Sequence, residues 1–216
     1  MRYEIKIPFI KNDLSLVLNS LRQIRGISEQ YKERHIHSIY FDTKDLQLAR
    51  HNIEGLSKRY KFRIRWYDHQ FKKYNYEIKK KDNKLGEKSV YENNGTDFND
   101  IENFYNKKNK YLLANTSKEE SFLIKILNLK PIVKVSYLRK YFLHNSGVRL
   151  TIDKSIKYEA IGKSLKHYDN YYVLEYKFEK DNYLSAQNLI KNSIFNPRRY
   201  SKYIKALSCV NKLVYY

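Results

Sequence analysis

Several residue types are scarce in this 216-residue chain, and each shortage narrows what the protein can be. The single cysteine, Cys209, cannot form an internal disulfide or build a cysteine-based metal site, which indicates a reducing, cytoplasmic setting. Six glycines and three prolines leave no room for a long flexible linker. No stretch approaches the roughly 20 apolar residues of a membrane span, and the first residues lack a signal-peptide pattern. We therefore expect one cytoplasmic domain over residues 1–216.

Positive charge, in contrast, is abundant. Lys and Arg number 43 against 23 Asp and Glu, which gives a formal net charge of +20. Such an excess favours an anionic partner: nucleic acid, an anionic membrane surface or a phosphate-rich small molecule. It also fits a chain rich in Lys, Asn, Tyr and Ile throughout, where part of the charge is only a solvated surface. The positions of the charges must decide between these interpretations.

Alternation with a period of two residues predicts strands along most of the chain. Strands are expected at residues 2–7, 35–41, 60–67, 73–81, 86–91, 132–143, 148–153, 157–161 and 171–178. Helical spacing predicts helices at residues 14–24, 43–51, 97–105, 119–129, 182–192 and 201–212. Asp13 is a candidate cap for the first of these. Many strands without a βαβ rhythm predict an α+β fold with a largely antiparallel sheet.

The polar face of one strand after another carries the same chemistry. Residues i and i+2 of a strand point to the same side. The polar sides hold Glu4 and Lys6; Arg63 and Arg65; Glu77 and Lys79; Tyr137 and Arg139; Arg149, Thr151 and Asp153; and Glu175 and Lys177. These faces either look at water, or they point into a barrel whose apolar exterior is covered by helices. Buried charges in that number need partners or a matching ligand, and a polyanion would supply the match.

Nine short blocks resemble the triphosphate tunnel metalloenzymes: the first resembles the Glu-x-Glu-x-Lys signature of that superfamily, and the rest are closer to one branch, the VTC domain of polyphosphate polymerases. They are RYEIK (2–6), SIYFDT (38–43), KRYKFRIRWY (58–67), EIK (77–79), KSV (88–90), VSYLR (135–139), VRLTID (148–153), LEYK (174–177) and RYSKY (199–203). The blocks run in family order over nearly the whole chain. Together they favour the inward-facing arrangement.

The resemblance implies a closed antiparallel eight-stranded β-barrel with helices packed outside, whose interior binds ATP and inorganic polyphosphate or triphosphate. By the family pattern, phosphates would be held by Lys6, Arg63, Arg65, Lys79, Lys88, Tyr137, Arg139, Arg149, Lys177, Arg199, Ser201 and Lys202. The residues expected to act directly in the reaction are Lys6, Arg63, Arg65, Arg139, Arg149 and Glu175.

A divalent cation, Mn²⁺ or Mg²⁺, is implied by the same resemblance, with Glu175 as its ligand. Arg2 stands where the wider superfamily has the first glutamate of a Glu-x-Glu-x-Lys signature, so one expected ligand is missing. This departure agrees with the polymerase branch rather than with a hydrolytic site of two carboxylates. Glu4 and Glu77 are either further metal ligands or partners of the neighbouring Lys and Arg side chains.

The expected activity is transfer of the γ-phosphate of ATP to a growing polyphosphate chain. A phosphate nucleophile is already ionised, so no general base is needed, and His35 and His37 are interpreted as structural or surface residues. Three alternatives remain: a triphosphatase on the same scaffold, a non-catalytic polyphosphate-binding module that works with membrane-protein partners, and a nucleic-acid-binding surface of Tyr, Lys and Arg. Strict alternation and the lack of a nucleic-acid motif argue against the last.

Overall fold

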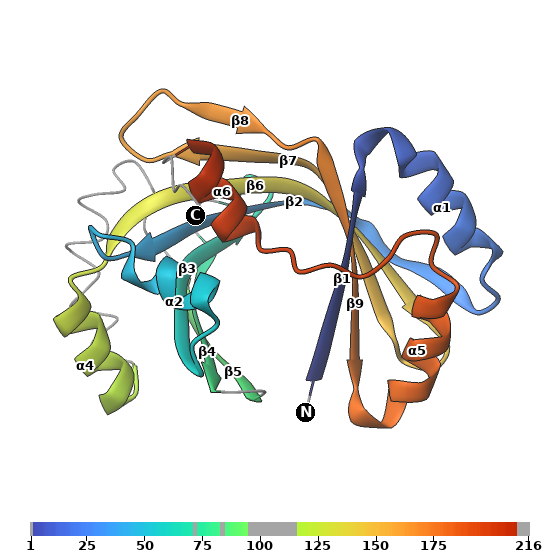
Figure 1. Ribbon diagram of the computed structural model, residues 1–216, viewed down its shortest axis with the longest axis horizontal. Helices are drawn as coiled ribbons and strands as arrows, with labels where there is room; N and C mark the ends of the chain where they lie inside the picture. The colour runs from blue at the N-terminus through green and yellow to red at the C-terminus, as the bar shows by residue number, and fades with distance from the viewer. Residues whose placement is uncertain (1, 71–72, 83–84, 95–115, 211–216) are drawn as a thin grey trace.

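A computed structural model describes residues 2–70, 73–82, 85–94 and 116–210. Figure 1 shows a strongly curved sheet that arches over a concave side, with helices at both flanks. The strands are β1 (Arg2–Ile10), β2 (Ile27–Asp42), β3 (Lys58–Tyr67), β4 (Lys73–Asp82), β5 (Leu85–Asn94), β6 (Lys130–His144), β7 (Arg149–Ala160), β8 (Lys166–Tyr168) and β9 (Tyr171–Glu179). The α-helices are α1 (Leu14–Gln23), α2 (Gln47–Glu54), α4 (Lys118–Leu127), α5 (Tyr183–Lys191) and α6 (Lys202–Val210).

Eight of these strands form one continuous antiparallel path in the order β1-β9-β7-β6-β2-β3-β4-β5, and β8 pairs with β7. The α+β class and the antiparallel sheet are therefore as predicted. The closed barrel is not confirmed, because β1 and β5 form the two edges and share no backbone pairing in the described residues. Side chains reach across the opening instead: the Lys79 ammonium on β4 lies 3.5 Å from a Glu4 carboxylate oxygen on β1.

The apolar faces of the strands look outward, as the inward-facing alternative requires. One convex cluster joins β1, β9, β7 and β6 to α1 and α5, and includes Ile7, Leu21, Leu150, Tyr176 and Leu189. A second joins β2, β3 and β4 to α4, and includes Phe41, Phe62, Ile64, Tyr76 and Ile124. Burial of these side chains removes apolar surface from water and leaves the charged faces on the concave side.

Helix α6 departs from the prediction that all helices pack outside. It packs Tyr203, Ala206, Leu207 and Val210 against concave-facing residues of β6 and β7, such as Val135. Figure 1 shows α6 beneath the arch of the sheet. The concave face therefore has an apolar part, covered by α6, and a charged part. Lys202, the first residue of α6, lies where the two parts meet.

A bulge in β7 keeps both parts on the same face. Ser155 has a positive φ of 52°, and the register between β6 and β7 shifts between Ser136 and Leu138. An extra residue in a strand resets the alternation. Asp153 and Ile156 consequently face the same concave side although they are three positions apart, and the predicted strands at 148–153 and 157–161 are one strand.

The other predicted elements agree with the structure in type and approximate position. Strand β2 begins earlier than expected, at Ile27, and β8 was not predicted. Asp13 occupies the N-cap position of α1 but its side chain makes no capping hydrogen bond. The predicted helix at 97–105 lies outside the described residues. No helix in the described part of the chain has the length and apolar character of a membrane span.

Candidate functional site

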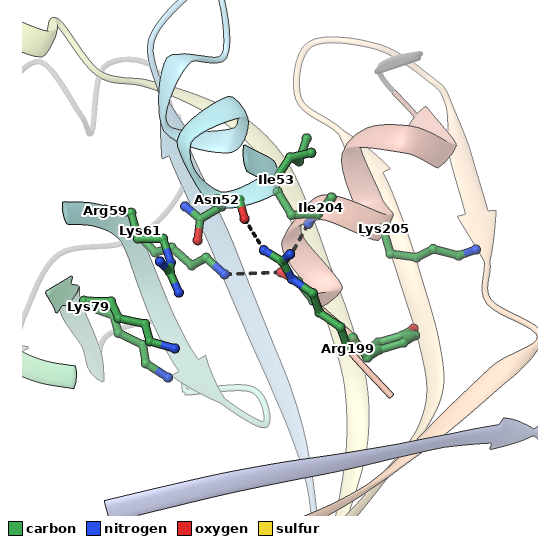
Figure 2. A pocket seen from close by; sticks show the side chains of 11 residues that line it. Asn52, Ile53, Arg59, Lys61, Lys79, Arg199, Ile204 and Lys205 are labelled. Atoms are coloured by element: carbon green, nitrogen blue, oxygen red, sulfur yellow. Dashed lines mark hydrogen bonds between the residues drawn. The ribbon is translucent and has the colours of Figure 1, made fainter. Parts of the chain in front are cut away.

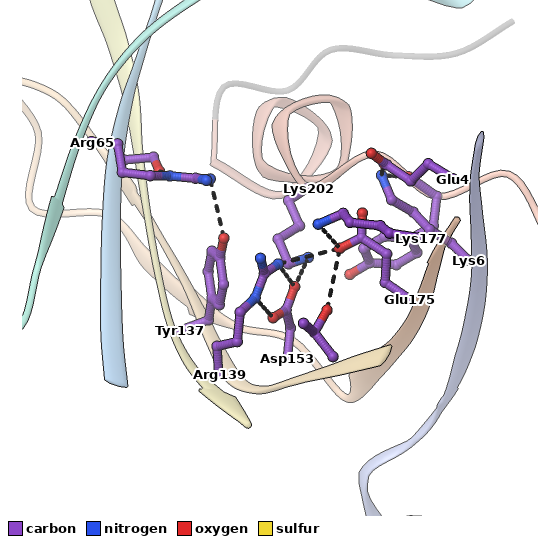
Figure 3. A network of polar contacts seen from close by, with 12 residues as sticks. Glu4, Lys6, Arg65, Tyr137, Arg139, Asp153, Glu175, Lys177 and Lys202 are labelled. Atoms are coloured by element: carbon purple, nitrogen blue, oxygen red, sulfur yellow. Dashed lines mark hydrogen bonds and ion pairs between the residues drawn. The ribbon is translucent and has the colours of Figure 1, made fainter. Parts of the chain in front are cut away.

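The charged part of the concave face gathers side chains from most of the sheet. Figure 3 shows residues of β1, β3, β6, β7, β9 and α6 pointing toward one another. The predicted residues joined there by hydrogen bonds, ion pairs or ring contacts are Glu4, Lys6, Arg63, Arg65, Glu77, Lys79, Lys88, Tyr137, Arg139, Glu175, Lys177 and Lys202. We call this set, with Asp153, the central network.

Asp153 holds two of the predicted phosphate-binding cations. Its carboxylate accepts two hydrogen bonds from Arg139, at 2.5 and 2.7 Å, and forms an ion pair with Lys202 at 2.5 Å. Asp153 has no exposed surface. Burial would raise the pKa of this carboxyl, but Arg139 and Lys202 lower it to about 2. The charge on Asp153 therefore fixes both cations in place.

Glu175, the predicted metal ligand, lies on the neighbouring strand. Its Oε2 atom is 3.3 Å from Arg139, 3.2 Å from the Lys177 ammonium and 3.5 Å from the Thr151 hydroxyl. Burial would raise the pKa of Glu175, but Lys177 and Lys6 hold it well below its usual range. The carboxylate is therefore ionised and oriented toward the concave face, where it can bind a cation.

Glu77 organises the opposite side of the network. It pairs with Arg63 through Nε at 2.6 Å and Nη2 at 2.5 Å, and with Lys88 at 2.8 Å. Arg63 also donates to the Tyr40 hydroxyl at 3.2 Å. Burial would raise the pKa of Glu77, but Arg63 and Arg65 lower it to about 2. Of the two interpretations of Glu77, the structure supports the partner of neighbouring cations.

Among the described residues, Arg65 differs from Arg63 and Arg139 because its hydrogen-bond partners are neutral hydroxyl groups. It donates to Ser38 at 3.1 Å and to Tyr137 at 3.1 Å (Figure 3), and its exposed fraction is 8%. The Tyr137 ring also carries the Lys202 ammonium 4.8 Å from its centroid. In the described part of the chain no carboxylate bonds to Arg65 directly, so its guanidinium can donate to a ligand.

Glu4 and Lys6 of β1 close the network at the sheet opening. Their side chains pair at 2.8 Å, and Lys6 also donates to the Tyr200 carbonyl at 3.3 Å. Burial and the nearby Glu175 raise the pKa of Glu4, while Lys6 and Lys79 lower it, and the net effect is a lowered pKa. Glu4 therefore lies beside cations, as expected of an ion-pair partner, and also near a second carboxylate, as expected of a metal ligand.

Arg199, Ser201 and Lys79 line a separate cavity of about 440 Å³ beside the central network (Figure 2). Arg149 differs from the other predicted residues. It is exposed at the start of β7 and lies opposite Lys177 in the register of β7 and β9, which places both on the concave side. Its role in phosphate binding stays a prediction.

The carboxylates of the central network could supply some, but not all, of the oxygen ligands that a hard divalent cation needs. The described residues hold no group of three or more His, Cys, Asp or Glu arranged as a metal site. Glu175 and Glu4, however, lie near enough for Glu175 to raise the pKa of Glu4. Two carboxylate donors suit Mn²⁺ or Mg²⁺ when phosphate oxygens and water complete the coordination. Glu175, Glu4 and Glu77 each pair with cations, so their role as metal ligands stays a prediction.

Several residues of this face were not singled out from the sequence as site residues. Asp153, Ser38 and Tyr40 hold Arg139, Arg65 and Arg63, and Lys61 lines the cavity. Lys61 and Asp153 follow the same two-residue alternation as their predicted neighbours, so the pattern contained a signal for both. The hydroxyl partners depend on pairing between strands, which alternation within one strand does not reveal.

Comparisons with known proteins agree with this geometry. The family model of the VTC domain matches residues 1–211, so the chain belongs to the VTC domain family. No curated protein sequence matches the chain.

Solved structures share the fold at low sequence identity. A Hippeastrum protein, which bears the name of an adenylyl cyclase and has a dominant triphosphatase activity, is 17% identical with a TM-score of 0.63, over 96% of each chain. A Vibrio parahaemolyticus protein named as an adenylate cyclase is 11% identical with a TM-score of 0.52, over 95% of this chain and 98% of that one. The PH1819 protein of Pyrococcus horikoshii is 13% identical with a TM-score of 0.51, over 95% and 96%.

Proposed function

We propose that the protein is a polyphosphate polymerase that transfers the γ-phosphate of ATP to a growing inorganic polyphosphate chain. The observation that carries the proposal is the surplus of positive charge in the central network. Its cations are Lys6, Arg63, Arg65, Lys79, Lys88, Arg139, Lys177 and Lys202, and its carboxylates are only Glu4, Glu77, Asp153 and Glu175. A triphosphate can neutralise that surplus, and membership of the VTC domain family favours polyphosphate as the product.

The arginines of the network suit the task of gripping and neutralising phosphates. Arg63 and Arg65 lie two residues apart on β3 and share its concave face, and Arg139 lies on the concave face of β6. A guanidinium donates two parallel hydrogen bonds to a phosphate, whereas Lys202 and Lys6 act as point charges. Fixed donors of this kind stabilise charge that develops during phosphoryl transfer without reorganising.

The network supplies no general base, and the proposed reaction needs none. The acceptor is the ionised terminal phosphate of the chain, which attacks the γ-phosphorus while the β–γ bridging bond breaks and ADP leaves. A divalent cation held by Glu175 and Glu4 would supply further neutralisation of phosphate charge. Lys6 and Lys177, which contact those carboxylates, would orient them.

A triphosphatase is the second candidate, because the Hippeastrum neighbour with the same fold has that activity. Water would then replace polyphosphate as the acceptor. A third candidate is a polyphosphate-binding module without turnover, assembled with membrane-protein partners. All three candidates use the same charged face, so they differ in product rather than in site.

Product analysis separates the candidates. We expect the purified protein, incubated with ATP and Mn²⁺, to give a ladder of polyphosphate on a polyacrylamide gel, with one ADP released for each phosphate unit added. Release of free phosphate without a ladder would identify a triphosphatase, and binding of ATP without turnover would identify a binding module.

Arg65→Ala ties the activity to the central network. We expect at least a ~100-fold loss of ATP turnover, the scale seen when one donor to a developing charge is removed. The fold should persist because, in the part of the chain that the structure describes, Arg65 bonds to neutral hydroxyls and forms no ion pair. Arg50→Ala is the matched control, since Arg50 is exposed and pairs with Asp45 outside the concave face. Wild-type turnover in Arg65→Ala would contradict the assignment.

A further inference from the structure

One short segment brings three of the residues that the sequence predicted to hold phosphates onto the concave face. These residues are Arg199, Ser201 and Lys202, at the start of α6. Figure 3 shows Lys202 entering the central network from α6, where its ammonium lies 2.5 Å from the Asp153 carboxylate. We call residues 198–203 the entry segment. Because the tip of a side chain follows its backbone, whatever fixes the entry segment also fixes the charge of Lys202.

The Tyr200 side chain anchors the entry segment to a buried carboxylate outside the central network. Its hydroxyl donates to Asp169 Oδ2 at 2.5 Å, and the Tyr158 hydroxyl of β7 donates to the same oxygen at 2.6 Å. The two hydroxyl oxygens lie 2.9 Å apart. The second carboxylate oxygen, Oδ1, accepts from the Tyr171 N–H at 3.0 Å. Asp169 therefore fixes Tyr200 to β7 and to the start of β9.

Asp169 differs from the carboxylates of the central network in its partners. It forms no ion pair with a cation in the part of the chain that the structure describes, and its exposed fraction is only 6%. Burial and the nearby Asp169 raise the pKa of Tyr200, so the Tyr200 hydroxyl stays protonated and donates. Any geometric effect of Asp169 on the charged face therefore passes through the Tyr200 hydroxyl.

The backbone of the entry segment is tied to the middle of β1. The Lys6 ammonium donates to the Tyr200 carbonyl at 3.3 Å, and the Arg198 N–H donates to the Lys6 carbonyl at 2.9 Å. The entry segment is therefore held at β1 and at Asp169, and Tyr200 takes part in both attachments.

A second tyrosine fixes the first turn of α6. The Tyr203 hydroxyl donates to Asp42 at the end of β2, and its ring stacks on Tyr40 with the centroids 4.8 Å apart. Asp42 has no exposed surface and also accepts three backbone N–H groups of residues 43–49 at 2.7–2.9 Å. Lys202 therefore lies between two tyrosines, each of which donates to a buried aspartate.

We propose that Asp169, acting through Tyr200, is a positioning residue that holds Lys202 in place to meet a phosphate group of the substrate. The proposal rests on the proposed function, and Asp169 itself would contact no reacting atom. The Lys202 ammonium lies against Asp153 and 4.8 Å from the centroid of the Tyr137 ring, so its place in the network is narrowly defined. A misplacement of about 1 Å in such a group can cost about 100-fold in rate.

The test measures binding of inorganic tripolyphosphate by isothermal titration calorimetry, without divalent metal and without turnover. Tyr200→Phe removes the hydroxyl that Asp169 holds and keeps the ring. Tyr176→Phe is the matched control, because the Tyr176 hydroxyl lies 2.6 Å from Ser193 Oγ beside the convex cluster of β1, β9, β7 and β6. Both variants lose one hydrogen-bonded hydroxyl, so their midpoints of unfolding in urea should fall by similar amounts.

We expect Tyr200→Phe to bind tripolyphosphate about three- to tenfold more weakly than wild type, the range that the loss of one hydrogen bond allows. Tyr176→Phe should bind it within about twofold of wild type. Unchanged affinity in Tyr200→Phe would overturn the proposal. An equal loss in Tyr176→Phe would overturn it too, because general loosening of the fold would then explain both results.

Lys202→Ala decides whether the loss passes through Lys202. In the Lys202→Ala background we expect Tyr200→Phe to change the affinity less than about twofold, because the group that Asp169 positions is absent. Asp169→Asn should show the same dependence, with weaker binding when Lys202 is present and little change when it is not. The same loss with and without Lys202 would overturn the proposal.

These measurements do not depend on catalysis. A protein that binds tripolyphosphate with this coupling but makes no polyphosphate would disprove the polymerase and leave the role of Asp169 standing.

Discussion

Two cation-rich regions of the concave face differ in the groups to which their cations bond. Around Asp153 and Glu175, each buried carboxylate is shared by at least two cations at 2.5–3.3 Å. In the cavity beside them, Arg59, Lys61 and Arg199 bond to carbonyl and hydroxyl oxygens. In the first region carboxylates neutralise part of the cationic charge, whereas in the second the cations bond mainly to neutral oxygen atoms.

Because of this difference, substitutions in the first region should mainly lower the stability of the fold, and substitutions in the second should mainly lower affinity for the anion. Removing one member of a paired, buried set leaves an uncompensated charge, which is strongly destabilising. Removing a cation from a set without carboxylates relieves repulsion and costs only affinity. Substitutions in the two regions should therefore affect different measurements, although both regions lie on one face and serve the same anion.

The largest expected effect is on the unfolding of Asp153→Asn. The substitution keeps the shape of the side chain but leaves Arg139 and Lys202 without their shared counter-charge. We expect the free energy of unfolding in urea to fall by about 3–5 kcal/mol. Glu33→Gln is the control, because its ion pair with Lys154 at 2.8 Å is partly exposed and should contribute at most about 1 kcal/mol. Equal losses in the two variants would remove the distinction between the regions.

We expect pH to have a smaller effect, on the affinity of the cavity for polyphosphate. The pKa of Lys61 is lowered to about 7, so its ammonium is charged below that pH and loses its proton as the pH rises. Because a bound polyanion favours the charged form, affinity for long-chain polyphosphate should be roughly threefold to tenfold weaker at pH 8.5 than at pH 6.

Lys61→Arg isolates this contribution, since a guanidinium stays charged across the range. The variant is needed because the pKa of Lys177 in the central network is also lowered, to about 8. We expect the pH dependence of polyphosphate binding to be weaker in Lys61→Arg than in wild type. The same dependence in both proteins would assign the titration to another group.

The sequence predicted which side chains share a face but not how they pair. Strict alternation placed Arg63 with Arg65 and Glu175 with Lys177, and the family blocks indicated that these faces point inward. The contact of Arg139 with Asp153 depends on the register of β6 against β7, which the bulge at Ser155 sets. Alternation within one strand carries no information about that register.

Helix α6 illustrates a second limit. Its amphipathic pattern predicted a helix with one apolar face, but two faces of the sheet could have received it. The concave side of β6 and β7 is apolar beyond the bulge, where Val135 and Ile156 lie, and α6 packs there. The mixed character of that face, charged in one part and apolar in the other, could be seen only once the strands were paired.

Closure of the barrel is a third feature that could not be predicted correctly from the sequence. The family resemblance predicted it, whereas in the described residues β1 and β5 remain separate edges, and the side chains of Glu4 on β1 and Lys79 on β4 pair across the opening. Side-chain pairing across an opening has no signature in hydrophobic periodicity.

The central claim is that the charged concave face binds a triphosphate, and a crystal structure with inorganic tripolyphosphate and Mn²⁺ tests it most directly. We predict phosphate oxygens within hydrogen-bonding distance of Arg63, Arg65, Arg139 and Lys202, with the metal bound to Glu175. A tripolyphosphate bound only on the convex surface, with the pairs of Arg139 and Arg63 undisturbed and no anion between them, would contradict the account.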